Sequence, residues 1–147
     1  MEMAVCEAAL LGGWTLERWS IDWSDGRPTS YPFGEDASGL LLYASGGCMS
    51  AGISRKGRSG LGGGNVRHAP ESARAAAFDG YFQYQGRFRV LGNVVEHHVT
   101  HSLNPDFVGT VQRREALLED DRLELRAEER TQEGTTRLHR LVWRRAS

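Results

Sequence analysis

The chain has 147 residues, of which 25% are charged and 39% hydrophobic, and its formal net charge is −1. This length suits a single domain over residues 1–147 with a substantial core. The near-zero charge argues against nucleic acid or an anionic membrane as a partner. No apolar run is long enough to span a bilayer, and no secretory leader pattern is evident. Cys6 and Cys48 are too few for a disulfide framework, so we expect a reduced, cytoplasmic protein.

The first third of the chain predicts strands separated by turns. A strand from Leu11 to Trp23 ends at the turn signal Asp25-Gly26, and a loop containing proline and glycine follows. Two shorter strands, over residues 40–43 and 48–53, are predicted to form a hairpin. Apolar residues alternate along the second of them, which gives it one inward face.

The middle of the chain predicts a loop and a helix. Residues 54–67 are rich in glycine and arginine and show no hydrophobic period, which indicates a mobile loop. Pro70 precedes a helical pattern over residues 71–78 that ends at Asp79-Gly80. A weaker helical pattern covers residues 2–10. We expect the loop and the short central helix to form a lid over one end of the domain.

Everything after Gly80 is predicted as strand. Eight or nine strands with short connections indicate an all-β fold, and sequential antiparallel pairing favours a single up-and-down β-barrel. In three of these strands, alternate residues are expected to share one inward face: Phe82, Tyr84, Phe88 and Val90; Val95, His97, Val99, His101 and Leu103; and Thr110, Gln112, Arg114, Ala116 and Leu118.

Several motifs follow one another in a specific order along the chain: Gly12-Gly13-Trp14; the segment Tyr31 to Tyr43; Tyr81, Tyr84, Gly86 and Phe88; His97 to Thr110; Arg114; and Trp143 with Arg145. In order and spacing they resemble the lipocalin-like domain family of small bacterial and fungal β-barrel proteins. The resemblance implies a barrel with a ligand-sized interior, but no single reaction. It also implies that Arg145 packs over Trp14 and closes one end of the barrel. The chain departs from the family pattern at His101, Arg113 and Glu115.

His97, Arg114 and Tyr84 are the candidate catalytic residues. An imidazole pointing into the barrel is suited to acid–base chemistry at neutral pH, although a hydrogen-bonded core histidine is the alternative. Arg114 would bind a carboxylate or a developing enolate oxygen, or else form a structural salt bridge with Glu96, Glu115 or another carboxylate. Tyr84 would form a proton-transfer pair with His97.

The remaining inward residues are expected to form the ligand-binding walls: Met49, Phe82, Phe88, Val99, His101, Phe107 and Gln112. A metal site is not expected, because His97 and His101 would lie about 13 Å apart on one strand. The glycine-rich loop lacks the Gly-Lys-Ser/Thr sequence of a phosphate-binding loop.

These residues predict a cofactor-independent enzyme that acts by proton transfer on a small hydrophobic metabolite. It would be an isomerase, cyclase or dehydratase of natural product biosynthesis, with His97 as general acid or base. A non-catalytic binder or carrier of such a metabolite is the alternative. A filled barrel that forms a homo-oligomer through its outer faces is the third interpretation.

Overall fold

A computed structural model describes residues 4–146, which form one closed barrel of eight antiparallel strands. Each strand pairs with the next along the chain, and β8 returns to pair with β1, so the predicted up-and-down barrel is confirmed. The strands are β1 (Gly12–Trp23), β2 (Ser38–Tyr43), β3 (Cys48–Ser54), β4 (Tyr81–Leu91), β5 (Val94–Ser102), β6 (Val111–Glu119), β7 (Arg122–Arg130) and β8 (Thr136–Arg145). The helical elements are α1 (Glu7–Leu10), α2 (Glu71–Asp79) and two 3₁₀ turns, η1 (Val66–His68) and η2 (Pro105–Phe107).

One end of the barrel is plugged by its own side chains. Trp14 and Trp143 are almost completely buried there, at 0% and 1% exposure. The Arg145 guanidinium lies 4.2 Å from the centre of the Trp14 ring, as the sequence predicts. It also donates hydrogen bonds to the backbone carbonyls of Ala9 and Leu11, which ties α1 across this end. The weak helical pattern over residues 2–10 thus becomes the single turn α1, with residues 2 and 3 outside the described part.

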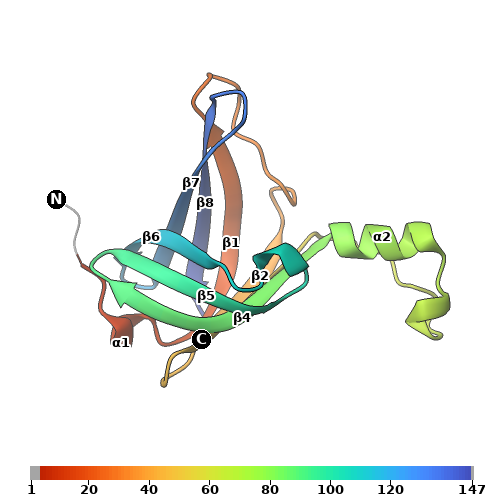
Figure 1. Cartoon of the computed structure of the whole chain (residues 1–147), viewed down its shortest axis with the longest axis horizontal. Helices are drawn as coiled ribbons and strands as arrows, with labels where there is room; N and C mark the ends of the chain where they lie inside the picture. Colours follow the sequence, from red (N-terminus) through yellow and green to blue (C-terminus); the bar gives the residue numbers. More distant parts are fainter. Residues whose placement is uncertain (1–3, 147) are drawn as a thin grey trace.

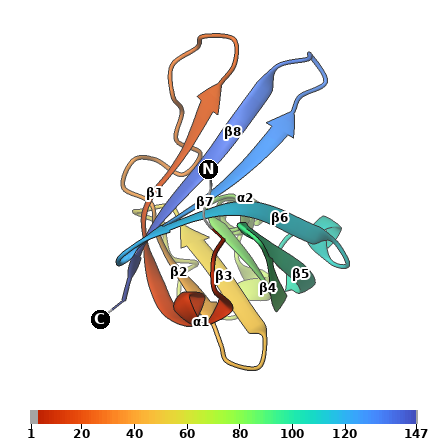
Figure 2. The ribbon, with the colours of Figure 1, turned by 90° about the vertical axis from the view of Figure 1, so that its left-hand side faces the viewer.

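The other end of the barrel is open because three strands extend further than the others. β1, β7 and β8 extend together beyond the body of the barrel (Figures 1 and 2). β6 pairs with β7 only from Glu115–Arg126 to Glu119–Arg122, so within residues 4–146 the remainder of β7 has no strand paired to it on that side. This difference in length leaves the interior open between β6 and the far half of β7.

The central helix does not form the predicted lid. The helix itself is confirmed as α2, but it projects away from the barrel together with the preceding loop and η1 (Figure 1). None of the residues of α2 is buried, and Phe78 and Val66 are about half exposed, at 49% and 57%. The expectation of a lid is therefore wrong for this structure. No helix among residues 4–146 has the length and apolar character needed to cross a bilayer.

A β-bulge changes which side chains of β5 point inward. Gln85 pairs with His101, whereas the next residue, Gly86, pairs with Val99, so Thr100 is an extra residue in β5. The alternation is shifted by one position beyond the bulge. His101 therefore lies exposed on the outer surface, and the prediction that it shares the inward face of His97 is wrong.

Candidate functional site

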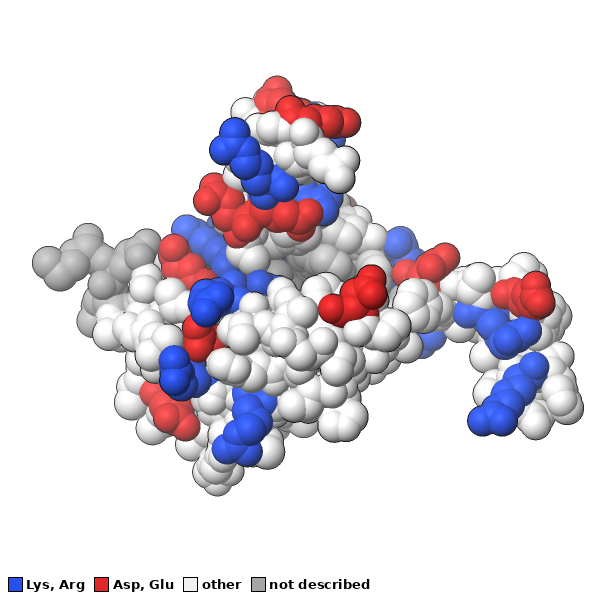
Figure 3. Space-filling model, viewed as in Figure 1, with Lys and Arg blue, Asp and Glu red and all other residues white. Residues whose placement is uncertain are grey.

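The open end of the barrel leads into a cavity of about 460 Å³. Figure 3 shows the hollow below the projecting ends of β1, β7 and β8. This volume lies within the usual range for small-molecule sites. Its walls are mostly apolar and aromatic, with a few polar groups. The lining residues are Trp19, Leu41, Ala51, Ile53, Phe82, Tyr84, His97, Phe107, Gln112, Arg114, Leu125, Ala127, Glu128, Glu129, His139, Leu141 and Trp143.

His97 connects two tyrosine hydroxyls inside the barrel. Its Nδ1 lies 2.7 Å from the Tyr84 hydroxyl, and its Nε2 lies 2.7 Å from the Tyr43 hydroxyl. The three residues come from β5, β4 and β2, and all are at most 4% exposed. Tyr84 lines the cavity, whereas Tyr43 lies behind His97 in the core, packed against Phe88. The imidazole therefore links a core hydroxyl with a cavity hydroxyl.

Burial keeps His97 and the two tyrosines bonded to it uncharged. Burial is the main cause that lowers the pKa of His97, to about 3, and the nearby charges of Arg114 and His98 lower it further. Burial also raises the pKa of Tyr43 well above its ordinary value. The pKa of Tyr84 is raised by burial as well, but the Arg114 guanidinium opposes this through its charge and through hydrogen bonding. At neutral pH the group therefore consists of one neutral imidazole and two neutral phenols.

Arg114 places a positive charge in the cavity wall. Its guanidinium donates hydrogen bonds to the backbone carbonyl of Arg113, at 2.9 Å, and to Oε1 of Gln112, at 3.5 Å. Glu96, one of the salt-bridge partners considered from the sequence, lies on the outer face of the sheet, where it is only 3% exposed. There its carboxylate contacts Arg113 at 2.9 Å and His98 at 3.1 Å. The guanidinium of Arg114 therefore faces the cavity without pairing with Glu96.

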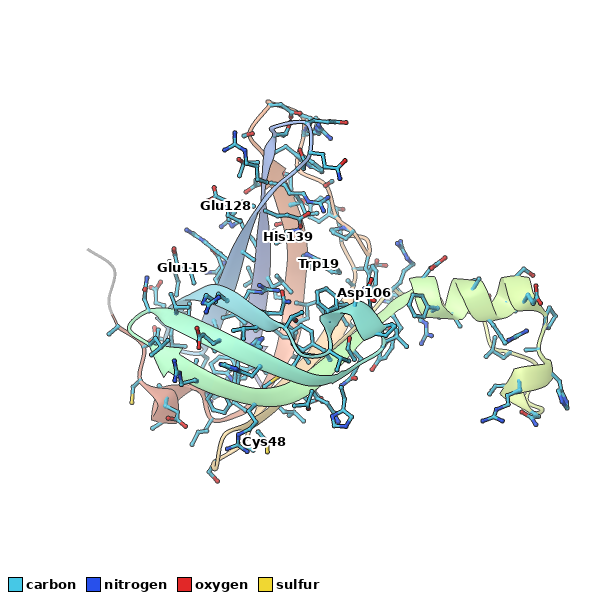
Figure 4. All side chains as sticks on the ribbon, in the orientation of Figure 1. Trp19, Cys48, Asp106, Glu115, Glu128 and His139 are labelled. Atoms are coloured by element: carbon cyan, nitrogen blue, oxygen red, sulfur yellow. The ribbon has the colours of Figure 1, made fainter. Side chains whose placement is uncertain are left out.

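The structure brings together most of the predicted site. His97, Arg114, Tyr84, Phe82, Phe107 and Gln112 all line the cavity. Met49, Phe88 and Val99 are buried, but they fill the core below the cavity instead of lining it. Their inward parity is confirmed, and only their depth in the barrel differs from the expectation. His101 lies outside the barrel in a shallow surface groove beside Cys48; Figure 4 labels Cys48 below the barrel body.

The set predicted from the sequence omits three residues that shape the hydrogen bonds of the site, two of them in the cavity wall and one in the core behind it. Tyr43 shares the inward parity of Leu41 on β2, which is the signal that could have found it. Trp19 and His139 lie on the projecting parts of β1 and β8, and their rings lie side by side (Figure 4). Only the pairing of β1 with β8, which the sequence does not reveal, brings these two residues together.

The polar groups of the cavity are suited to binding oxygen. Tyr84 and Arg114 both present hydrogen-bond donors close to one another, and Gln112 adds an amide. Around them the wall is apolar. Among residues 4–146, no three histidine, cysteine or acidic side chains are grouped as a metal would require. The site is therefore a small apolar chamber with an electropositive, proton-donating patch on one wall.

A closed eight-stranded barrel with a ligand-sized, largely apolar interior defines a class of small-molecule-binding proteins. The model of the lipocalin-like domain family matches residues 11–146, almost the whole chain, and the chain belongs to that family. No curated protein matches the chain, and no solved structure does. The family assignment agrees with the resemblance found in the motifs.

Proposed function

We propose that this protein is a cofactor-independent enzyme that acts on a small, largely apolar metabolite bearing a carbonyl or enol oxygen. The reaction is an isomerisation, a cyclisation or a loss of water of the kind found in secondary metabolism. One observation carries the proposal: the Tyr84 hydroxyl is held 2.7 Å from His97 in the cavity wall, beside the Arg114 guanidinium. This arrangement provides two donors for one substrate oxygen.

The hydrogen bonds around His97 support a definite direction of donation. Within residues 4–146, the only side-chain hydrogen bond of the buried Tyr43 hydroxyl is to His97. If Tyr43 donates its proton to Nε2, the single proton of the neutral imidazole lies on Nδ1 and is donated to the oxygen of Tyr84. The proton of Tyr84 is then available to a ligand. The opposite direction would leave the proton of Tyr43 buried without an acceptor, which is unfavourable.

In this proposal His97 acts through Tyr84 and does not exchange a proton with the substrate. Both of its ring nitrogens are engaged, and its pKa of about 3 makes it a weak base. This changes the role expected from the sequence, where His97 was the general acid or base. Tyr84 and Arg114 are the groups that would touch the reacting oxygen.

The chemistry that such a pair favours is the stabilisation of negative charge on oxygen. In a cyclisation, a hydroxyl of the substrate adds to a conjugated carbon–carbon double bond, and the electron pair moves to the carbonyl oxygen held by Tyr84 and Arg114. The proton lost by the hydroxyl ends on the adjacent carbon as the carbonyl re-forms. No atom is gained or lost, so the reaction needs no cofactor. The apolar walls would hold the substrate in a folded shape.

A carrier function is the second candidate, and one observation favours it. The two histidines of the cavity wall are both engaged by other side chains, His97 by tyrosines and His139 by Trp19. Neither therefore offers a free ring nitrogen as a base. A pocket with donors but no free imidazole suits a protein that binds an oxygen-bearing apolar molecule and releases it unchanged.

An incubation with a metabolite extract from the producing cells, followed by mass spectrometry, distinguishes the enzyme from the carrier. Wild type is compared with Tyr84→Phe and with Tyr81→Phe, which removes a hydroxyl from the outer surface of the same strand. An enzyme converts one compound to an isomer or a dehydrated product with wild type and Tyr81→Phe, but not with Tyr84→Phe. Retention of the same unchanged compound by all three proteins would identify a carrier. Proteins that neither bind nor convert any compound would contradict both functions.

A further inference from the structure

A second polar cluster occupies the open end of the cavity and takes no part in the chemistry proposed above. It consists of Trp19 on β1, Glu129 on β7, and Arg137 and His139 on β8. Trp19, Glu129 and His139 line the same cavity as Tyr84 and Arg114. Trp19 and His139 lie on the projecting strands β1 and β8 (Figure 4), and both line the cavity.

The contacts of His139 determine which of its nitrogens carries the proton. Trp19 donates its indole N–H to Nδ1 of His139, with 3.2 Å between the nitrogens. Because an indole N–H can only donate, Nδ1 must be unprotonated. The proton of the neutral ring is therefore on Nε2, which lies 3.4 Å from a carboxylate oxygen of Glu129. Donation runs from Trp19 through His139 to Glu129, and Arg137 binds the same carboxylate.

Trp19 covers the apolar part of the cavity next to this cluster. Its ring meets Phe33, from the loop after β1, edge to face at 5.1 Å between centroids. It also lies 6.5 Å from Phe82 across the cavity wall. The indole thus lies between the loop and the interior. The hydrogen bond to His139 is the only one that its N–H makes within residues 4–146.

We propose that Trp19 is a ligand-contacting residue at the open end of the cavity, and that His139 is the positioning residue that holds it there only while the imidazole is neutral. A protonated imidazole carries a hydrogen on both nitrogens, so Nδ1 can no longer accept the indole N–H. Two donors would then face one another, and the indole would lose its fixed position. Retention of an apolar ligand would therefore weaken in acid.

The charged groups around His139 come from three strands. Glu129 on β7 favours the protonated form, whereas Arg137 on β8 and Arg114 on β6 oppose it. From β1 the ring meets the neutral indole of Trp19. Burial is the largest effect, and the pKa of His139 is lowered from its ordinary value as a result. The neutral ring, and with it the hydrogen bond to Trp19, is thus the form present at neutral pH.

The hydrogen bond can be tested without any ligand. Protein labelled with ¹⁵N-tryptophan gives four indole N–H signals, and the absence of one in Trp19→Phe identifies Trp19. We expect this signal to shift with pH with a single midpoint below 6.5, and to stop titrating in His139→Asn, whose amide oxygen takes the place of Nδ1 and still accepts the bond. The indoles of Trp14 and Trp23 donate to groups that do not titrate, so they serve as internal controls. A Trp19 signal that is unchanged while His139 titrates would overturn the proposal.

The effect on ligand retention is measured with the neutral apolar dye N-phenyl-1-naphthylamine at pH 7.5 and at one pH unit below the midpoint found for the Trp19 signal. The dissociation constant of wild type should rise about fivefold at the lower pH, the equivalent of one hydrogen bond. It should stay constant in His139→Asn, whereas His101→Asn, which changes an exposed histidine outside the barrel, should behave as wild type. Equal binding at both pH values, or no binding by wild type, would overturn the role in retention. Because this inference rests on the cavity of the proposed function, Tyr84→Phe is included: it should keep the pH effect even if it abolishes turnover.

Discussion

The hydroxyl groups of Tyr43 and Tyr84 are joined through one imidazole, each lying 2.7 Å from a different nitrogen of His97. Tyr43 is the last residue of β2, and Tyr84 lies in β4, so the connection crosses the interior between strands that are not neighbours in the sheet. One of the two tyrosines is in the core, and the other is in the cavity wall. The direction in which the hydrogen bonds of the cavity wall donate therefore depends on Tyr43, which lies in the core outside the cavity.

Removing the core hydroxyl should destabilise the protein. Tyr43→Phe leaves Nε2 of His97 buried without a partner, and we expect the free energy of unfolding to fall by about 1–3 kcal/mol. Urea unfolding monitored by circular dichroism measures the change. Tyr81→Phe is the matched control, because it removes a hydroxyl from the outer surface of the barrel. An equal, small effect of both substitutions would contradict a structural role for the Tyr43–His97 bond.

His97 should make the stability of the protein depend on pH. Its pKa is lowered from 6.5 to about 3 in the folded protein, so between these values the unfolded chain binds more protons. The stability that the neutral ring contributes is complete above pH 6.5 and is lost as the pH falls towards 3. By pH 5 the expected loss is about 2 kcal/mol.

The measurement for this effect is the free energy of unfolding of wild type and His97→Gln at pH 7 and pH 5. The glutamine amide can bond both tyrosines but does not titrate in this range. Wild type should therefore lose about 2 kcal/mol more than the variant over this interval. Parallel losses in the two proteins would show that other groups account for the acid sensitivity.

The sequence predicts the barrel well because the signals involved are local. Alternation along β3 and β4 gives the inward faces, and turn residues give the strand ends, so the strand order follows from short connections. The prediction of a lid is wrong because the position of a helix relative to the barrel is not set by local signals. A helix can be predicted from Pro70 and the pattern after it, but the direction in which it leaves the barrel depends on tertiary packing, and α2 has none of its residues buried.

For the candidate site, the sequence could predict only which side chains of a strand point into the barrel. His97, Tyr84 and Arg114 were found because each alternates with apolar neighbours. His101 was misplaced because a single extra residue, Thr100, shifts the register of β5, and no residue pattern marks that bulge. The partnership of Trp19 with His139 depends on barrel closure between the first and last strands, which lies beyond any local signal.

The closed end of the barrel should depend on Arg145. Its guanidinium contacts the Trp14 ring and donates to two backbone carbonyls of the α1 segment. Arg145→Met keeps an apolar side chain but loses these interactions, and we expect a loss of about 2–4 kcal/mol in unfolding free energy. The neighbouring Arg144→Met removes only an exposed ion pair with Glu17 and should cost less than about 1 kcal/mol. Equal effects of the two substitutions in urea unfolding would show that Arg145 does not close the barrel.

Gly86 should be intolerant of any side chain because β4 and β5 approach closely there. A Cβ at this position would lie 2.0 Å from the backbone carbonyl oxygen of His98, well inside contact distance, and the bulge beside it leaves little freedom to adjust. Gly86→Ala should therefore lower the free energy of unfolding by about 3 kcal/mol or more, or prevent folding. Gly64→Ala, in the projecting loop with no atom within 4 Å of the added carbon, is the control and should leave stability almost unchanged. The two variants are compared by urea unfolding and, where Gly86→Ala does not fold, by the yield of soluble protein. A stable, fully folded Gly86→Ala protein would mean that the strands separate at the bulge at little cost, and the register that places His97 in the interior would then need to be re-examined.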